Sequence, residues 1–273
     1  HEVFNAGMHQ RAVALLQLET DLRWASERQE FRLWYQPIIT LETGQIGGFE
    51  ALIRWQHPER GLVSPLDFIP VAEETGWIVP IGRWVLEEAC QQLAQWHRDF
   101  PREVPLTMSV NLSSKQFMQS DLIPFIESLL RLHNLPPGTL KLEITESALM
   151  ENAQDVTDRL LQMRAIGCLL GLDDFGTGYS SLSYLHRFPL DTLKIDRSFI
   201  ARMTEGGENR EIVRTIVSLG RNLGLDVVAE GVEDEKQLAD LRVLNCKSGQ
   251  GYFFARPLPA PDAHKLIAAA PIW

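Results

Sequence analysis

Short apolar runs recur along the chain, and seven of them end in a carboxylate, an amide or a lysine. A bare carboxylate inside an apolar strand is costly unless it is paired or bound to a cation. Seven such runs in one order therefore predict strands whose ends point at one shared polar site. The runs cover residues 48–54, 108–111, 140–146, 169–174, 193–196, 227–233 and 248–251.

Strand-like and helix-like patterns alternate through most of the sequence. Ahead of them, residues 5–29 form one predicted helix, because Leu15, Leu18, Leu22 and Ala25 recur at spacings of three or four. The predicted strands are residues 31–39, 46–54, 105–111, 140–145, 168–173, 191–196, 226–230 and 250–254. The predicted helices are residues 66–75, 80–98, 121–133, 151–166, 179–187, 208–223, 234–244 and 261–269.

The order of these elements predicts an α/β fold, since strands that alternate with helices imply parallel pairing through right-handed crossovers. An open doubly wound sheet fits this order, but eight repeats without an obvious split favour a closed barrel with its chemistry at the carboxyl ends of the strands. The connection over residues 41–45 is too short for a crossover helix, so the first two strands form a hairpin. We therefore expect a modified, TIM-like (β/α)8 barrel with an antiparallel first strand.

Composition agrees with one large cytoplasmic domain. The chain has 273 residues, 45% of them hydrophobic, and α/β barrels often exceed 200 residues without splitting. No apolar run reaches the roughly 18 residues that span a bilayer, and no signal peptide is evident, so we expect no membrane insertion by this segment. Three distant cysteines favour buried thiols in a reducing cytosol. The net charge of -10 weighs against binding of a DNA or RNA polymer.

Six polar positions at or near strand ends offer only oxygen ligands. No cysteine or histidine joins them at a metal-like spacing, and hard oxygen sites suit Mg²⁺, Mn²⁺ or Ca²⁺. Two such cations about 3.5–4 Å apart are a standard device for cleaving phosphate esters. The six residues are Glu50, Asn111, Glu143, Asp173, Asp174 and Glu230.

Two cationic side chains fit the same chemistry. Lys194 follows an apolar strand and could orient or help deprotonate a water molecule. Arg54 shares a strand face with Glu50 and suits a phosphate oxygen. Taken alone, Glu50 and Arg54 would form an ordinary salt bridge, and Asp173-Asp174 would cap a turn. The histidines, among them His57, are scattered, and solvent-facing roles are favoured over metal ligation for them.

The ordered set of motifs resembles the EAL-domain cyclic-di-GMP phosphodiesterases over about residues 28–262. Any one triplet carries no weight, but the whole set in this order is highly specific. The motifs are Tyr35-Gln36-Pro37-Ile38, Glu50-Ala51-Leu52-Ile53-Arg54, Asn111-Leu112-Ser113, Glu143-Ile144-Thr145-Glu146, Asp173-Asp174-Phe175-Gly176-Thr177-Gly178, Leu193-Lys194-Ile195-Asp196, Glu230-Gly231-Val232-Glu233 and Gln250-Gly251-Tyr252.

The resemblance implies hydrolysis of cyclic di-GMP to linear pGpG by two Mg²⁺ or Mn²⁺ ions, with Ca²⁺ inhibitory. It implies one ion held by Glu50, Asn111, Glu143 and Asp173, and a second served by Asp173, Asp174 and Glu230. Lys194 resembles the base that positions the water, and Glu233 and Gln250 resemble residues that support the metal-bound water and the substrate. Arg54, Gln250 and Gln36 are the expected substrate contacts, and Glu146 resembles the anchor of the loop 175–181, which couples dimerisation to metal binding.

The resemblance also bears on domain organisation. The opening helix is similar to the connector that follows a GGDEF module, so residues 1–28 are interpreted as a linker from an upstream GGDEF or sensor domain and residues 29–273 as the barrel. A homodimer is expected. Two other functions stay open: a catalytically silent receptor for cyclic di-GMP, and a protein-interaction module that uses the outer helices.

Overall fold

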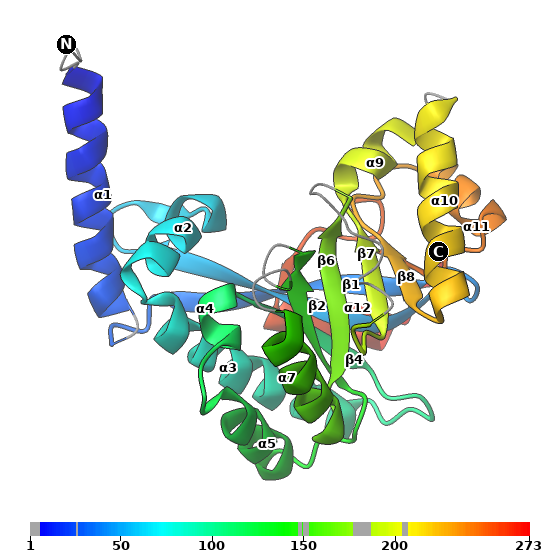
Figure 1. The fold of residues 1–273 in the computed structure, drawn as a ribbon, viewed down its shortest axis with the longest axis horizontal. Helices are drawn as coiled ribbons and strands as arrows, with labels where there is room; N and C mark the ends of the chain where they lie inside the picture. Colours follow the sequence, from blue (N-terminus) through cyan, green and yellow to red (C-terminus); the bar gives the residue numbers. More distant parts are fainter. Residues whose placement is uncertain (1–5, 26, 147–148, 150–152, 177–186, 204–206) are drawn as a thin grey trace.

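The computed structural model describes residues 6–25, 27–146, 149, 153–176, 187–203 and 207–273. Within them a closed eight-stranded barrel forms the centre of the molecule (Figure 1). Its strands are β1 (Phe31–Thr40), β2 (Gln45–His57), β4 (Thr107–Leu112), β5 (Leu140–Thr145), β6 (Leu169–Phe175), β7 (Thr192–Ile195), β8 (Asp226–Ala229) and β9 (Ser248–Gly249). Two short strands extend the sheet, β3 (Gly61–Val63) on β2 and β10 (Leu258–Pro259) on β1.

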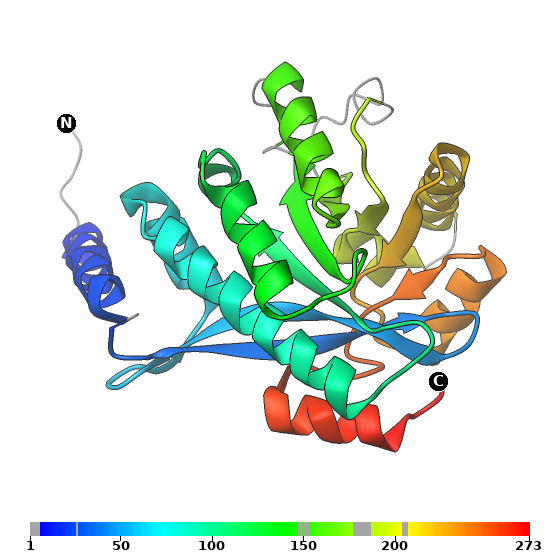
Figure 2. The same ribbon diagram turned by 90° about the horizontal axis from the view of Figure 1, so that it is seen from below.

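Helices surround the barrel on the outside (Figure 2). In the second view α12 lies beneath the β1–β2 hairpin, and α3, α5 and α7 lie side by side. The described helices are α1 (Ala6–Ala25), α2 (Pro65–Thr75), α3 (Ile78–Asp99), α4 (Ser114–Phe117), α5 (Leu122–Leu132), α7 (Ala153–Ala165), α9 (Arg197–Arg202), α10 (Glu208–Leu223), α11 (Glu235–Val243) and α12 (Ala260–Ala269).

The strand directions confirm the predicted fold class. β1 runs antiparallel to both of its barrel neighbours, β2 and β9. The other barrel strands, β2 and β4 to β9, are parallel to one another. Their carboxyl ends therefore meet at one mouth of the barrel, and the antiparallel β1 brings its middle residues to the same place.

Some element boundaries differ from the predicted ones. The predicted strand over 250–254 is wrong, because β9 ends at Gly249 and the chain then turns. Gly251 lies against Val232, where an added Cβ would be 2.1 Å from the Val232 carbonyl oxygen. The predicted helix 5–29 ends at Ala25, and β3, α4 and α9 were too short to predict. The predicted helix 179–187 lies almost wholly outside the described residues.

The last part of α1 packs against α2 and reaches the end of β2. Leu18, Leu22 and Ala25 are buried in the core. Asp21 Oδ2 lies 3.2 Å from His57 Nε2, at the end of β2. The prediction of a solvent-facing His57 is therefore wrong, since that residue is buried and its Nδ1 accepts from two backbone N–H groups. The division of the chain at residue 28 stays a prediction.

The search for membrane-spanning helices among the described residues gives a negative result: none combines the length and the apolarity that crossing a bilayer requires.

Gly48 shows how closely β2 approaches β4 beneath the mouth. A Cβ at this position would lie 2.1 Å from Thr107 Oγ1 and 2.6 Å from the Thr107 carbonyl oxygen. We expect Gly48→Ala to lower the free energy of unfolding by about 2 kcal/mol, because the backbone of β4 would have to move. Urea unfolding followed by circular dichroism measures this change, and an unaltered midpoint would contradict the expectation.

Candidate active site

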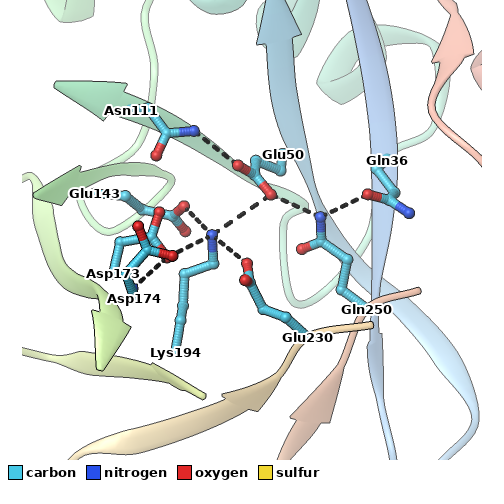
Figure 3. A network of polar contacts seen from close by, with 9 residues as sticks. All are labelled: Gln36, Glu50, Asn111, Glu143, Asp173, Asp174, Lys194, Glu230 and Gln250. Carbon is cyan, nitrogen blue, oxygen red and sulfur yellow. Dashed lines mark hydrogen bonds and ion pairs between the residues drawn. The ribbon is translucent and has the colours of Figure 1, made fainter. Parts of the chain in front are cut away.

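Glu50 on β2 lies at the centre of the amide side of the mouth, which is the part formed with Asn111, Gln250 and Gln36 (Figure 3). It is only 5% exposed. Asn111 Nδ2 donates to Glu50 Oε1 at 2.7 Å, and Gln250 Nε2 donates to Glu50 Oε2 at 2.6 Å. The same Gln250 nitrogen lies 2.9 Å from Gln36 Oε1. Residues of β4, β1 and the chain just after β9 are thus fixed around a carboxylate of β2. The Glu50–Arg54 salt bridge, which those two residues taken alone would suggest, is not among the ion pairs of the described residues.

Lys194 on β7 lies at the centre of the acidic side of the mouth, where carboxylates surround its ammonium group. Its side chain is 1% exposed, and its Nζ lies 2.7 Å from Glu143 Oε2 and 2.6 Å from Glu230 Oε1. Asp173 Oδ1 follows at 3.2 Å and Glu50 Oε2 at 3.5 Å. Figure 3 shows these carboxylates converging on the ammonium from different strands. One cation thus holds together acids separated by 180 positions along the chain.

Asp173, Asp174 and Glu230 form a tighter acidic group beside this ammonium. One carboxylate oxygen from each lies within 4.8 Å of the others, an arrangement that could hold a metal ion. Asp174 adopts a left-handed backbone conformation with φ 55°, which is uncommon for a residue other than glycine. Its N–H donates to Asp173 Oδ1 at 3.0 Å. The turn therefore presents two consecutive carboxylates at the end of β6.

The electrostatics of the mouth reflect an excess of acid over base. Burial raises the pKa of Glu143 to about 7 and that of Glu230 to about 8, although Lys194 acts against both shifts. Burial also acts on Glu50, but Lys194 and the amides of Gln250 and Asn111 lower its pKa. Burial opposes the charge of Lys194, yet Glu143, Glu50 and Glu230 keep its pKa well above the ordinary value. A single ammonium group cannot neutralise the negative charge of this many carboxylates, so bound protons or additional cations must neutralise the rest.

These shifts predict how the metal-free protein responds to pH. Because the folded-state pKa values of Glu143 and Glu230 lie above the ordinary value of 4.5, the folded protein binds protons more tightly than the unfolded chain. The stabilisation is full below about pH 4.5 and is lost as the pH rises through 7 and 8. We expect the free energy of unfolding in EDTA to fall by several kcal/mol between pH 5 and 8.5. Urea titrations at several pH values measure this fall, which Mg²⁺ should reduce, and a flat profile would contradict it.

The donor set fits hard divalent cations. Every candidate ligand offers oxygen, and the amide oxygen of Asn111 accepts no hydrogen bond from the described residues. The buried carboxylates outnumber the cation among them, which is the situation that Mg²⁺ or Mn²⁺ relieves. The structure thus brings together all six residues that the sequence proposed as metal ligands.

Three predicted site residues lie outside this network. Arg54 lies four residues beyond Glu50 on the strand that carries it, with its guanidinium carbon 5.3 Å from the centre of the Trp34 ring. Glu233 is exposed, and its backbone N–H donates to Gln237 Oε1. Glu146 is buried directly after β5, while most of the loop that it was expected to anchor lies outside the described residues. The roles of all three stay predictions.

The sequence reasoning did not single out the aromatic groups near the site. Tyr252 lies just after Gln250 in the chain, and the guanidinium carbon of Arg256 lies 4.2 Å from the centre of its ring. Arg54 lies over the Trp34 ring in the same way. Tyr252 is 53% exposed. An aromatic residue directly after the Gln250-Gly251 pair was the available signal.

An α/β barrel that gathers the carboxylates of Glu50, Glu143, Asp173, Asp174 and Glu230 at the carboxyl ends of its strands, here called the carboxylate cradle, has the architecture that barrel enzymes use for their active sites. Residues 19–257 match the EAL domain family, and the chain belongs to that family.

Named relatives and solved structures agree with this assignment. The bifunctional diguanylate cyclase/cyclic di-GMP phosphodiesterase MucR of Pseudomonas aeruginosa is 46% identical over 97% of this chain and 38% of its own length. The cyclic di-GMP phosphodiesterase PdeR of Escherichia coli is 42% identical over 94% and 38%. The structure of the MucR phosphodiesterase in complex with c-di-GMP superposes with a TM-score of 0.86 at 46% identity, covering 90% of this chain and 99% of that one. The chain thus spans about two fifths of the length of either curated relative.

Proposed function

We propose that this chain hydrolyses cyclic di-GMP to linear pGpG with the help of two divalent cations, Mg²⁺ or Mn²⁺. The observation that carries the proposal is the convergence of Glu50, Glu143, Asp173 and Glu230 on Lys194 at one barrel mouth. The relatives named as cyclic di-GMP phosphodiesterases support the substrate, and the c-di-GMP complex of the MucR phosphodiesterase supports its binding to a domain of this shape.

The chemistry follows from the charges of the mouth. When bound, divalent cations supply positive charge that activates water and stabilises the pentacoordinate phosphorus. Water oxygen attacks phosphorus as the bond from phosphorus to the ribose 3′ oxygen breaks, and the proton that the attacking water gives up passes, directly or through solvent, to the leaving oxygen. Lys194 holds its own proton firmly, since the surrounding carboxylates raise its pKa, and it therefore suits a positioning role toward the attacking water.

The remaining groups fall into supporting roles. Glu50, Asn111, Glu143 and Asp173 would hold one cation, and Asp173, Asp174 and Glu230 would hold the other. Gln250, which donates to both Gln36 and Glu50, and Gln36 itself would meet the nucleotide together with Arg54. Glu233 would support the attacking water, and Glu146 would connect the site to a homodimer contact. We also propose a cytoplasmic location and an upstream GGDEF or sensor domain in the full-length protein.

The test is conversion of cyclic di-GMP by the purified chain, followed by chromatography of the nucleotides. We expect pGpG with Mg²⁺ or Mn²⁺, little product with Ca²⁺, and none from Glu50→Ala. An absence of turnover in the unaltered chain would reject the enzyme. Tight calorimetric binding with unchanged nucleotide would favour the silent receptor instead, and no nucleotide affinity at all would favour an interaction module.

A further inference from the structure

One buried cation of the barrel interior takes no part in the site described above. Lys141 is the second residue of β5 and is 8% exposed. It precedes Glu143 by two positions, so both side chains lie on the same face of the strand. Strand pairing places Glu50 beside Ser109 and Ser109 beside Lys141. Because Glu50 points into the barrel, Ser109 and Lys141 point inward as well, as one row across three neighbouring strands.

A glycine on the next strand makes room for this side chain. A Cβ at Gly171 would lie 3.3 Å from Glu143 Cγ and 3.7 Å from Lys141 Cδ. The stem of Lys141 therefore runs past β6 directly beneath Glu143, in the space that a larger residue at position 171 would fill. The charge of Lys141 therefore lies in the layer of the barrel just below the carboxylate cradle.

Lys141 has no ion-pair or hydrogen-bond partner in the part of the chain that the structure describes. The nearby acids are engaged elsewhere: Asp226 binds Lys247 at 2.7 Å, Asp191 binds Arg164 at 3.2 Å, and Glu143 binds Lys194. The hydroxyl of the adjacent Ser109 is also buried without a partner. A buried ammonium without a contact partner is costly, so its position calls for a compensating interaction at longer range.

The cradle can supply that interaction: burial lowers the pKa of Lys141, and Glu143 is the foremost of the acids that act against this effect. The cradle carries more buried carboxylates than Lys194 can neutralise, and Coulomb interactions in a protein interior extend well beyond contact distance. A cation below the cradle lowers the mutual repulsion of the acids when no metal is bound. The same cation repels a divalent ion that enters the cradle.

We propose that Lys141 is a positioning residue that supports the metal-free acidic cradle from below and weakens its affinity for divalent cations. It thereby sets the concentration of Mg²⁺ or Mn²⁺ at which the site fills. The inference rests on the proposed use of metal ions by the same cradle. It assigns to Lys141 no contact with substrate or metal.

Calorimetric titration of the metal-free protein with Mn²⁺ tests this role without any activity assay. We expect Lys141→Met to bind Mn²⁺ about tenfold more tightly than the unaltered chain, and Lys141→Arg to restore the original affinity. Lys265→Met is the matched control, since Lys265 is an exposed lysine paired with Asp262, and it should change nothing. Lys141→Gln serves as a second neutral variant should the methionine variant misfold, and it should show the same tightening.

The outcomes separate the two claims. Equal or weaker Mn²⁺ affinity in the folded neutral variants, beside normal uptake by the unaltered chain, overturns the role of Lys141 and leaves the proposed function intact. A failure of Lys141→Arg to restore the affinity points to packing rather than charge and also overturns it. An unaltered chain that takes up no Mn²⁺ overturns both.

Discussion

Asp173→Asn is expected to lower the turnover of cyclic di-GMP by at least about 10³-fold while changing nucleotide affinity by less than about tenfold. Asp173, like Glu230, both approaches Lys194, at 3.2 Å, and belongs to the close acidic group with Asp174. Asparagine keeps the shape of the side chain but removes its charge. Cation charge stabilises the transition state more than the bound substrate, so the loss should fall on turnover.

Turnover and affinity must be measured separately for this test. Chromatographic rates with Mg²⁺ give the first, and calorimetry with cyclic di-GMP in the presence of Ca²⁺ gives the second. Asp262→Asn is the matched control, because Asp262 is an exposed carboxylate on α12 that pairs with Lys265. Equal losses of affinity and turnover in Asp173→Asn would contradict the expected role.

Lys194→Met is expected to combine a loss of activity with a metal-dependent loss of stability. The substitution leaves Glu50, Glu143, Asp173 and Glu230 without their shared cation. Removing one partner from a buried charge cluster costs about 3 kcal/mol or more, and turnover should fall by about 10²- to 10⁴-fold as the water loses its positioning group. Saturating Mg²⁺ should restore most of the stability, since divalent charge replaces the ammonium.

Thermal unfolding in EDTA and in Mg²⁺ measures the second effect. The gain in melting temperature on adding Mg²⁺ should be larger for Lys194→Met than for the unaltered chain. Lys265→Met, which removes a 77% exposed ammonium, should behave as the unaltered chain does. A variant that Mg²⁺ stabilises no more than the unaltered chain would show that Lys194 and the cations do not share one cradle.

The sequence predicts the architecture because parallel strands impose a regular order on the chain. The apolar runs locate the barrel strands, and the short 41–45 connection indicates the antiparallel hairpin that the pairing of β1 with β2 confirms. The eighth strand was placed too late, since Gln250-Gly251-Tyr252 has an apolar neighbourhood although the chain turns there against Val232. Short elements such as β3 lack enough residues to show a period.

The set of candidate metal ligands was predictable for a different reason. Carboxylates at the ends of apolar strands violate the hydrophobic pattern, so they stand out in the sequence, and the barrel topology brings such violations together. Lys141 did not stand out in the same way, because a lysine in the Leu140–Leu142 run looks like a side chain that reaches solvent. Only the register with Ser109 and the space at Gly171 place it inside.

The way α1 docks determines where the expressed polypeptide can be shortened. Cutting at residue 28 would uncover the surface now covered by Leu18, Leu22 and Ala25 and would take Asp21 away from His57. The uncovered patch is apolar and would promote self-association of the shortened product. Recombinant versions of this barrel should therefore begin ahead of Leu18, so that oligomer measurements report on the native surface rather than on a cut edge.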